Sequence, residues 1–437
     1  MEKQDLKRII LEQREEVEHL FRSERIVRRE LDIEQALRHP NAVVIMGPRR
    51  AGKSTLALSV VKERKSGYLN FDDERLSLTG PDLNLVLETL YEIHGDMDTV
   101  VLDEIQNIPG WELFIGRLRR TKRVIVTGSN ARLLAGELAS RLTGRHIDFT
   151  LFPFSFREFL VRRDGLPPSE ILTTSEEAAI RRELDAYRRD GGFPEVSKFG
   201  RVILKTLYED ILHKDIILRY KVRKSVAFRE LARLLAAQYS REFSYSRLKA
   251  AVQIEDVHTV KKFVDYLLAG YLFFAVERFS FKLKQQLISP RKIFGIDPGL
   301  VAATAFRISE DRGHLDENLV AVELLRRKAY WGEGDIFYWK DPDGAEVDFC
   351  IKTGPRITEL IQVCRSFAEM GKKERELGAL IKASEELRCR RLRVLTDDLE
   401  GEDTFRNVKV QLLPLWKWLL QAPGGPYAAR RHPPEHR

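Results

Sequence analysis

A loop typical of phosphate binding lies near the start of the chain and constrains the fold more than any other feature. It matches the pattern GxxxxGK[ST] in full and consists of Gly47, Pro48, Arg49, Arg50, Ala51, Gly52, Lys53, Ser54 and Thr55. The apolar run 42–46 before it predicts a buried strand, and residues 56–58 after it predict a helix. A strand, a glycine loop and a helix in this order indicate a parallel α/β sheet.

The residue types in this loop predict a nucleotide site. The glycines allow a tight turn whose backbone N–H groups surround phosphate oxygens at a helix N-terminus. We expect Lys53 to bridge the β- and γ-phosphates and the Ser54 hydroxyl to ligate Mg²⁺. ATP and Mg²⁺ are therefore the expected cofactors.

Two adjacent carboxylates provide the second half of the predicted site. Asp103 and Glu104 end the apolar run 100–102, and adjacent acids at a buried strand edge are costly without a cation. We expect Asp103 to hold Mg²⁺, directly or through water, and Glu104 to polarise the attacking water. The pair predicts hydrolysis of the nucleotide in addition to binding.

A third strand end offers a polar side chain to the γ-phosphate or to the water. Thr127 and Gly128 precede Ser129 and Asn130, and either of the last two can serve. The sequence favours Asn130 without excluding Ser129 or an ordinary turn.

Length and composition bound the remaining possibilities. The 437 residues suggest about three domains at roughly 150 residues each. Three cysteines without a CxxC pair argue against a disulfide framework or a thiolate zinc site. No apolar run approaches the ~18 residues of a membrane span, and the charged start is no signal peptide. We expect a soluble, cytoplasmic protein with no membrane partner.

Positive charge is concentrated in one segment. The whole chain has a net charge of +8, and residues 225–295 hold twelve Lys or Arg against six Asp or Glu. Apolar spacing in this segment predicts three helices, followed by a strand or hairpin over 278–284. This layout predicts a winged helix that binds DNA phosphates through Lys261, Lys262, Lys282 and Lys284. A helical lid with a solvated basic face is the alternative.

Several motifs occur together along residues 38–350. They are GPRRAGKST, YLNFDDERL, VVLDEIQN, VTGSNARLL, SRLTGRHIDFTLFPFSFREFL and GGFPEV. This set resembles archaeal and bacterial AAA+-type ATPases that carry a C-terminal domain of the DUF4143 type. The resemblance implies a P-loop ATPase core, a helical lid, a winged helix and a terminal domain similar to Holliday junction resolvases.

Two arginines, Arg141 and Arg145, follow a predicted short helix. A guanidinium supplied by a neighbouring subunit would stabilise charge on the transferred phosphoryl group. The resemblance implies that Arg145 is the likeliest such finger, although Arg141 stays open. A finger that acts in trans requires a ring or filament, so a hexamer is the default expectation.

The C-terminal segment resembles a metal-dependent nuclease that has lost its lysine. The resemblance places a helix glutamate, a strand aspartate and an (E or Q)xK pair together. Glu323 and Asp348 match the acids, Gln362 is a neutral substitute, and Cys364 stands at the lysine position. Because a thiol cannot replace an ammonium, we predict a nuclease fold without cleavage. Glu323 and Asp348 can also be plain structural acids.

The predicted fold is an α/β P-loop NTPase core of AAA+ type with a helical lid, a winged helix and a C-terminal restriction-endonuclease-like α/β domain. The expected division is a helical segment 1–36, ATPase core 37–150, lid 151–224, basic winged helix 225–300, inactive nuclease-like domain 301–420 and disordered tail 421–437.

Two classes of function fit these features. The first is an ATP-hydrolysing ring motor that binds and translocates on duplex or branched DNA. The second is an ATP-dependent regulatory switch whose basic segment contacts a protein or RNA partner. The sequence leaves the nucleic acid, the polarity and the ring size open.

Overall fold

The computed structural model describes residues 1–130, 144–165, 172–304, 312–367 and 371–421. The first sheet is parallel and contains, in spatial order, β2 (Ser66–Asn70), β3 (Thr99–Asp103), β4 (Arg123–Gly128), β1 (Ala42–Met46) and β5 (His146–Thr150). The strands expected before the phosphate loop, before Asp103 and before Ser129 are present as β1, β3 and β4, whereas β5 was not predicted from the sequence. The parallel α/β core is therefore confirmed.

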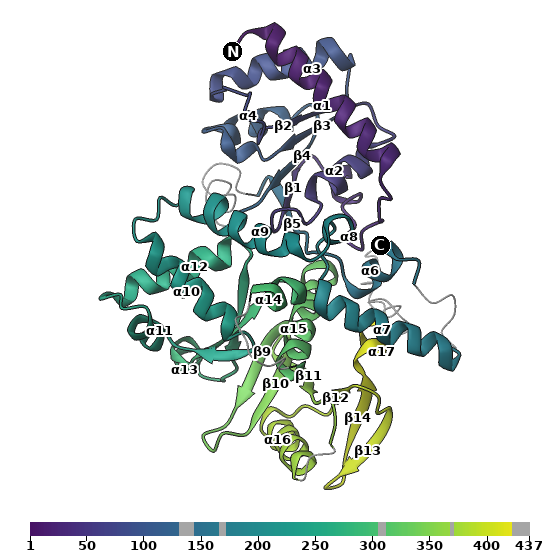
Figure 1. Cartoon of the computed structure of the whole chain (residues 1–437), viewed down its shortest axis with the longest axis vertical. Helices are drawn as coiled ribbons and strands as arrows, with labels where there is room; N and C mark the ends of the chain where they lie inside the picture. The colour runs from purple at the N-terminus through teal and green to yellow at the C-terminus, as the bar shows by residue number, and fades with distance from the viewer. Residues whose placement is uncertain (131–143, 166–171, 305–311, 368–370, 422–437) are drawn as a thin grey trace, which may run out of the picture.

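Helices cover both faces of this sheet (Figure 1), so its inner strands β1 and β3 are buried along their whole length. One face packs on α1 (Lys3–Ser23), α3 (Leu83–His94) and α4 (Trp111–Leu118). The other packs on α2 (Lys53–Val61) and on the segment 31–37. Side chains alternate between the faces, so Val44 lies in the first core and Ile45 in the second.

The N-terminal segment is only partly helical. Helix α1 ends at Ser23, where Glu24 has extended dihedral angles, and the chain runs without helix to the short 3₁₀ turn η1 (Ala36–Arg38). Further 3₁₀ turns are η2 (Gly80–Asp82) and η3 (Ile105–Asn107).

The segment predicted as a lid is helical but divides between two cores. Its helices are α6 (Phe156–Arg162), α7 (Thr174–Asp190), α8 (Val196–Phe199), α9 (Val202–Asp210) and the π-helix η4 (Ile211–Leu218). Helices α6 and α7 share a core with the C-terminal strands. Helix α9 and η4 share another core with the basic segment.

The basic segment folds as α10 (Ser225–Ala237), β6 (Arg241–Phe243), α11 (Tyr245–Ala251), α12 (Val257–Ala269), β7 (Phe273–Arg278), α13 (Leu283–Ile288) and β8 (Arg291–Gly295). The three predicted helices are present. Strand β7 ends at Arg278, and a short helix, α13, takes the place of the strand or hairpin expected through Lys284.

The remaining elements are α14 (Pro298–Thr304), α15 (Arg312–Trp331), β9 (Asp335–Lys340), β10 (Glu346–Thr353), β11 (Arg356–Val363), α16 (Lys372–Leu387), β12 (Leu392–Thr396), β13 (Gly401–Phe405), β14 (Val408–Pro414) and α17 (Leu415–Leu420). The tail 422–437, predicted as disordered, lies outside the described residues.

A second sheet of nine strands crosses the boundary expected at residue 300. Its order is β13-β14-β12-β11-β10-β9-β7-β8-β6. Strands β7 and β9 pair in parallel at Glu277 with Phe337, and the Phe279 N–H donates to the Tyr338 carbonyl at 2.7 Å. The strands of the basic segment and of the C-terminal segment therefore form one sheet (Figure 1).

Candidate nucleotide site and associated clusters

The phosphate-binding loop leaves the carboxyl end of β1 and leads into α2. Gly47 has a φ of 145°, and a Cβ at this position would lie 2.1 Å from the Leu151 carbonyl oxygen. Gly52, with a φ of 95°, precedes Lys53 at the start of α2. Because side chains are excluded at Gly47 and strained at Gly52, the loop keeps the tight curvature that a phosphate cradle needs.

The Lys53 ammonium folds back over this loop. It donates to the carbonyl oxygens of Gly47 at 3.2 Å and Pro48 at 3.1 Å. It also lies 3.7 Å from Glu104 Oε1, and Lys53 is only 5% exposed. The lysine of the loop and the predicted catalytic carboxylate are therefore neighbours.

Asp103 and Ser54 fit a magnesium ion. Asp103 ends β3 and accepts hydrogen bonds from the hydroxyls of Thr127 and, at 3.0 Å, Tyr68. Burial and the charge of Glu104 raise the Asp103 pKa, whereas a hydrogen bond with Ser54 lowers it. A cation beside Ser54 would offset the cost of this buried charge, and oxygen donors are those that Mg²⁺ prefers.

Glu104 adopts a left-handed backbone conformation directly after the strand, with a φ of 54°. Its N–H donates to the Thr127 hydroxyl at 3.1 Å, and Gln106 donates to its carboxylate. Burial raises the pKa of Glu104, but the charges of Lys53, Arg219 and Arg49 and the Gln106 hydrogen bond outweigh it, so the pKa is lowered. Glu104 is therefore an anion, as a group that accepts a proton from water must be.

The structure separates the roles of the two polar residues after β4. The Ser129 backbone N–H donates to Glu104 Oε2 at 3.3 Å, and the Ser129 hydroxyl oxygen lies 3.3 Å from the same Glu104 oxygen. Asn130 is fully buried and accepts a hydrogen bond from the Tyr220 hydroxyl at 2.8 Å. Ser129, the alternative to the favoured Asn130, therefore contacts the Glu104 carboxylate.

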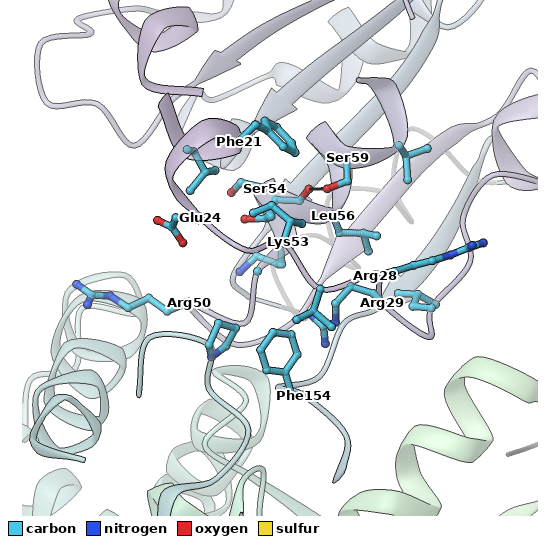
Figure 2. Close-up of a pocket in the computed structure, with 18 of the residues that line it drawn as sticks. Phe21, Glu24, Arg28, Arg29, Arg50, Lys53, Ser54, Leu56, Ser59 and Phe154 are labelled. Carbon is cyan, nitrogen blue, oxygen red and sulfur yellow. Dashed lines mark hydrogen bonds between the residues drawn. The ribbon is translucent and has the colours of Figure 1, made fainter. Parts of the chain in front are cut away.

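A cavity of about 780 Å³ opens beside the loop (Figure 2). Lys53 and Ser54 lie at its centre, with Phe21 from α1 on one side and Phe154 on the other. The non-helical segment 24–34 forms much of the remaining wall. This volume lies in the range of small-molecule sites, and the aromatic side chains suit a nucleotide base.

Arg29 fixes the segment 24–34 against the loop, and sequence reasoning missed it. Its guanidinium donates to Glu158 at 2.9 Å, to the Ala51 carbonyl at 2.8 Å and to the Phe152 carbonyl at 2.6 Å. Only its partners in the fold identify it, since an arginine in a charge-rich segment carries no signal of its own.

The side chains of Arg49 and Arg50, predicted to bind the cofactor, line the cavity and pair with carboxylates outside the loop. Arg49 pairs with Asp215 at 3.0 Å and with Asp72 at 3.3 Å. Arg50 extends toward the neighbouring helices (Figure 2) and pairs with Glu195 at 2.6 Å. Their backbone N–H groups stay in the loop, whereas their charges join it to the segment 195–215.

Arg145 lies at the amino-terminal ends of the parallel strands, opposite to the end that carries the phosphate loop. Its carbonyl accepts from the N–H of Ala42, the first residue of β1, whereas the phosphate loop follows the last. Arg145 is exposed and cannot reach the nucleotide of its own chain. Arg141 lies outside the described residues.

The four predicted DNA-binding lysines are exposed. Lys261 and Lys262 lie on α12, within 5.4 Å and 5.8 Å of the ring centroids of Tyr245 and Tyr266, respectively. Lys282 and Lys284 flank Leu283 at the start of α13.

The structure does not bring Glu323 to Asp348. Glu323 is buried and paired with three arginines, Arg326, Arg327 and Arg157. Glu317, six residues earlier on α15, lies near Asp348 instead. Six residues turn a helix by about 240° beyond one full turn, so the two glutamates face different sides. The predicted grouping of Glu323 with Asp348 is therefore wrong.

The ammonium group near Asp348 comes from β8. Lys292 Nζ lies 2.7 Å from Glu317 Oε1, 2.5 Å from Glu346 Oε1 and 3.4 Å from Asp348 Oδ1. Burial lowers the Lys292 pKa, but these carboxylates raise it well above its usual value, so Lys292 stays charged. Sequence reasoning missed Lys292 because it lies 56 residues from Asp348.

Gln362 and Cys364 complete the neighbourhood of Asp348. The Gln362 side-chain oxygen accepts from the Asp348 N–H at 3.2 Å. Cys364 is buried and donates to the Ser366 carbonyl at 3.4 Å, and burial raises the pKa of its thiol. It is therefore a neutral group. Among the described residues, no group of three or more His, Cys, Asp and Glu side chains is arranged to hold a metal ion.

Comparison with known proteins identifies three regions. Residues 39–160 match the family described as an AAA domain, and residues 312–418 match the domain of unknown function DUF4143. Residues 181–312 match a further domain of unknown function, DUF8612. The chain thus carries an AAA domain and a DUF4143 domain, as the motifs predicted.

Relatives occur in archaea and bacteria. An uncharacterized protein of Methanocaldococcus jannaschii is 29% identical over 91% of this chain and 91% of its own length. An uncharacterized protein of Haemophilus influenzae is 27% identical over 72% of this chain and 80% of its own length.

Two solved structures show weak overall similarity. The replication initiator DnaA, solved with AMPPCP and single-stranded DNA, is 17% identical over 54% of this chain and 86% of its own, with a TM-score of 0.26. A STAND ATPase with a tetratricopeptide repeat sensor from Pyrococcus horikoshii is 13% identical over 69% of this chain and 46% of its own, with a TM-score of 0.25.

In the described part of the chain, no helix is long and apolar enough to cross a membrane.

Proposed function

We propose, from the AAA domain at residues 39–160, that this chain binds and hydrolyses ATP with Mg²⁺. The observation that carries the proposal is the approach of Lys53 to the anionic Glu104, at 3.7 Å, on the wall of the cavity. A carboxylate at this distance from the phosphate-binding lysine can orient a water toward the γ-phosphate.

Each residue has a defined role in this proposal. The backbone of residues 47–52 surrounds the phosphates, and Lys53 contacts the β- and γ-phosphates. Ser54 and Asp103 hold Mg²⁺, which neutralises charge on the phosphates when bound. Glu104 orients the attacking water and accepts its proton, and Ser129 fixes the Glu104 carboxylate.

We further propose that the basic segment binds DNA through a winged helix. The order helix, strand, helix, helix, strand, helix, strand and the exposed Lys261 and Lys262 on α12 support this proposal, with α13 between the last two strands. Lysines bind phosphates without reading bases, so the expected affinity depends on salt and tolerates any sequence. This property suits a motor that translocates on DNA.

In this proposal the subunits form a ring in which Arg145 acts on a neighbouring nucleotide. The C-terminal domain contacts duplex or branched DNA without cutting it. Two observations support the absence of cleavage. Cys364 offers a neutral thiol where the motif has a lysine, and Lys292 already contacts three carboxyl groups, those of Glu317, Glu346 and Asp348. Metal-dependent cleavage by the pure protein, lost in Asp348→Ala, would contradict this part.

One observation favours a second candidate function, an ATP-dependent switch that contacts a protein or RNA. The α13 region exposes four large apolar side chains, Phe281, Leu283, Leu287 and Ile288, with exposed fractions of 58–74%. Apolar surface of this kind marks protein contacts more often than DNA contacts.

The steady-state ATPase rate tests both candidates. It is measured without DNA and with single-stranded, duplex or four-way-junction DNA, at two salt concentrations, together with the native mass. A motor shows stimulation by one form of DNA that weakens at high salt, in a ring-sized assembly. A rate that is unaffected by any DNA contradicts the motor and favours the switch.

A further inference from the structure

A carboxylate outside the AAA domain connects the phosphate loop to the strand end beside Glu104. Asp215 lies on η4 and is 1% exposed. Its Oδ2 accepts from Arg49 Nε at 3.0 Å, and its Oδ1 accepts from Arg49 Nη2 at 3.2 Å. The Ser129 hydroxyl lies 3.2 Å from the same Oδ1. Asp215 therefore contacts both the loop and the residue next to Glu104.

The next turn of the same segment adds two contacts with the end of β4. Arg219 Nη1 donates to the Ser129 hydroxyl at 3.3 Å, and its Nη2 donates to Asn107 at 3.2 Å. The Tyr220 hydroxyl donates to Asn130 at 2.8 Å. Residues 215–220 thus reach both polar residues that follow β4.

The position of these residues along the chain connects their contacts to the helices of the basic segment. The π-helix η4 continues α9, precedes α10 and shares a core with α10 and α12. π-helical turns are uncommon, and they occur frequently at functional sites. A movement of the basic segment would therefore move Asp215, and with it the partner of Ser129.

We propose that Asp215 is a positioning residue for ATP hydrolysis. It holds Ser129 against Glu104 only while η4 is docked on the phosphate loop. Hydrolysis then depends on the position of the helical unit 211–269, whereas nucleotide binding, which uses the loop backbone and Lys53, does not. This inference rests on the proposed ATP hydrolysis.

Asp215→Asn is the direct test, since it keeps the shape of the side chain and removes its charge. We expect kcat to fall roughly 10- to 100-fold, the size of effect that misplacement by about 1 Å produces. The dissociation constant of a fluorescent ATP analogue should stay within about threefold, because the loop is intact. The matched control is Lys214→Gln, which changes a half-exposed neighbour on the same helix and should leave both constants unchanged.

A double variant separates positioning from a structural role. Arg49→Gln with Asp215→Asn removes both members of the ion pair, so no buried charge is left without a partner. The double variant should regain thermal stability relative to Asp215→Asn. Its kcat should stay low, because Ser129 still lacks the carboxylate of Asp215. Recovery of kcat together with stability would overturn the inference.

Other outcomes are equally decisive. Wild-type kcat in Asp215→Asn, or an equal loss of affinity and kcat, contradicts a positioning role. If the wild-type protein binds ATP without hydrolysing it, the proposed hydrolysis is wrong. Backbone hydrogen exchange then tests the contact of Asp215 with Arg49 and Ser129. The backbone amides of residues 211–220 should exchange faster in Asp215→Asn than in the wild type, because the docked contact is weakened. Equal exchange in the two proteins would reject the inference.

Discussion

The Lys292 ammonium lies 3.4 Å from the Asp348 carboxylate, although the two residues belong to segments that the sequence assigns to different domains. Strand β8 supplies the lysine, strand β10 supplies the aspartate, and both strands belong to the nine-stranded sheet. Lys292 also lies 2.5 Å from Glu346 on β10, whose pKa is lowered by the Lys292 charge, so this ion pair links the basic segment to the DUF4143 domain.

Loss of this ammonium should destabilise the protein. Lys292→Met leaves Glu317, Glu346 and Asp348 without their shared cation, and removal of one partner from a buried ion pair costs about 3–5 kcal/mol. Urea unfolding measures the change. The control is Lys340→Met, whose side chain is 28% exposed and which should cost at most about 1 kcal/mol. Equal effects of the two variants would contradict a special role for Lys292.

Replacement of the predicted catalytic carboxylate should block turnover and spare binding. Glu104→Gln keeps the hydrogen-bonding shape but cannot accept a proton, so kcat should fall by about 10²–10⁴. Binding of a fluorescent ATP analogue should persist, because Lys53 and the loop are unchanged. The control is Glu112→Gln, a buried glutamate on α4 away from the cavity. Wild-type turnover in Glu104→Gln would refute the assignment.

Subunit mixing tests whether Arg145 acts on a neighbouring nucleotide. Arg145→Ala alone should bind ATP and lose about 10³-fold in kcat, and Lys53→Ala should lose nucleotide affinity or turnover. A mixture of the two inactive proteins should regain activity, because an intact Arg145 from one subunit meets an intact Lys53 of another. A mixture that stays inactive, in an assembly shown by native mass to contain both subunits, argues against a finger in trans.

The exposed lysines of α12 should contribute affinity without sequence preference. Lys261→Ala with Lys262→Ala should weaken binding to unrelated duplexes alike and make the dependence on salt less steep, as expected when phosphate contacts are lost. Fluorescence anisotropy at several salt concentrations measures both effects. Lys205→Ala with Lys214→Ala makes the same change of charge on α9 and η4, outside the basic segment. If both pairs weaken binding equally, only net charge matters.

Asp297 should make the stability depend on pH. Burial raises its pKa to about 6 despite hydrogen bonds from the N–H groups of Gly192, Leu300 and Gly299. Because this pKa exceeds the usual aspartate value of 3.8, the folded state retains the proton to higher pH. Protonated Asp297 therefore contributes about 3 kcal/mol to the free energy of unfolding below pH ~4. This contribution is lost as the pH rises through about 6.

Asp297→Asn removes that titration. The stability of the wild type relative to the variant should fall between pH 4 and 7 and level off above, as measured by urea unfolding at each pH. The comparison cancels the titration of the other carboxylates. A difference that stays constant over this range would contradict the raised pKa.

The glycine loop shows why part of the nucleotide site was predictable. Its residues are contiguous, and its chemistry depends on local backbone shape, so Gly47, Gly52 and Lys53 could be identified without a fold. Asp103 and Glu104 were found because a strand that ends in two acids is also a local pattern. The choice between Ser129 and Asn130 was not local, since it depended on which side chain faced Glu104.

The sequence by itself determined the parallel α/β core, the phosphate loop and the carboxylate pair, because each follows from neighbours along the chain. Only the tertiary structure decided which distant groups meet: Asp215 with Arg49, and Lys292 with Asp348. It also joined the strands on either side of residue 300 into one sheet through β7 and β9. The physical reason is that ion pairs and strand pairing depend on distance in space, and residues far apart in sequence leave no periodic pattern that reveals it.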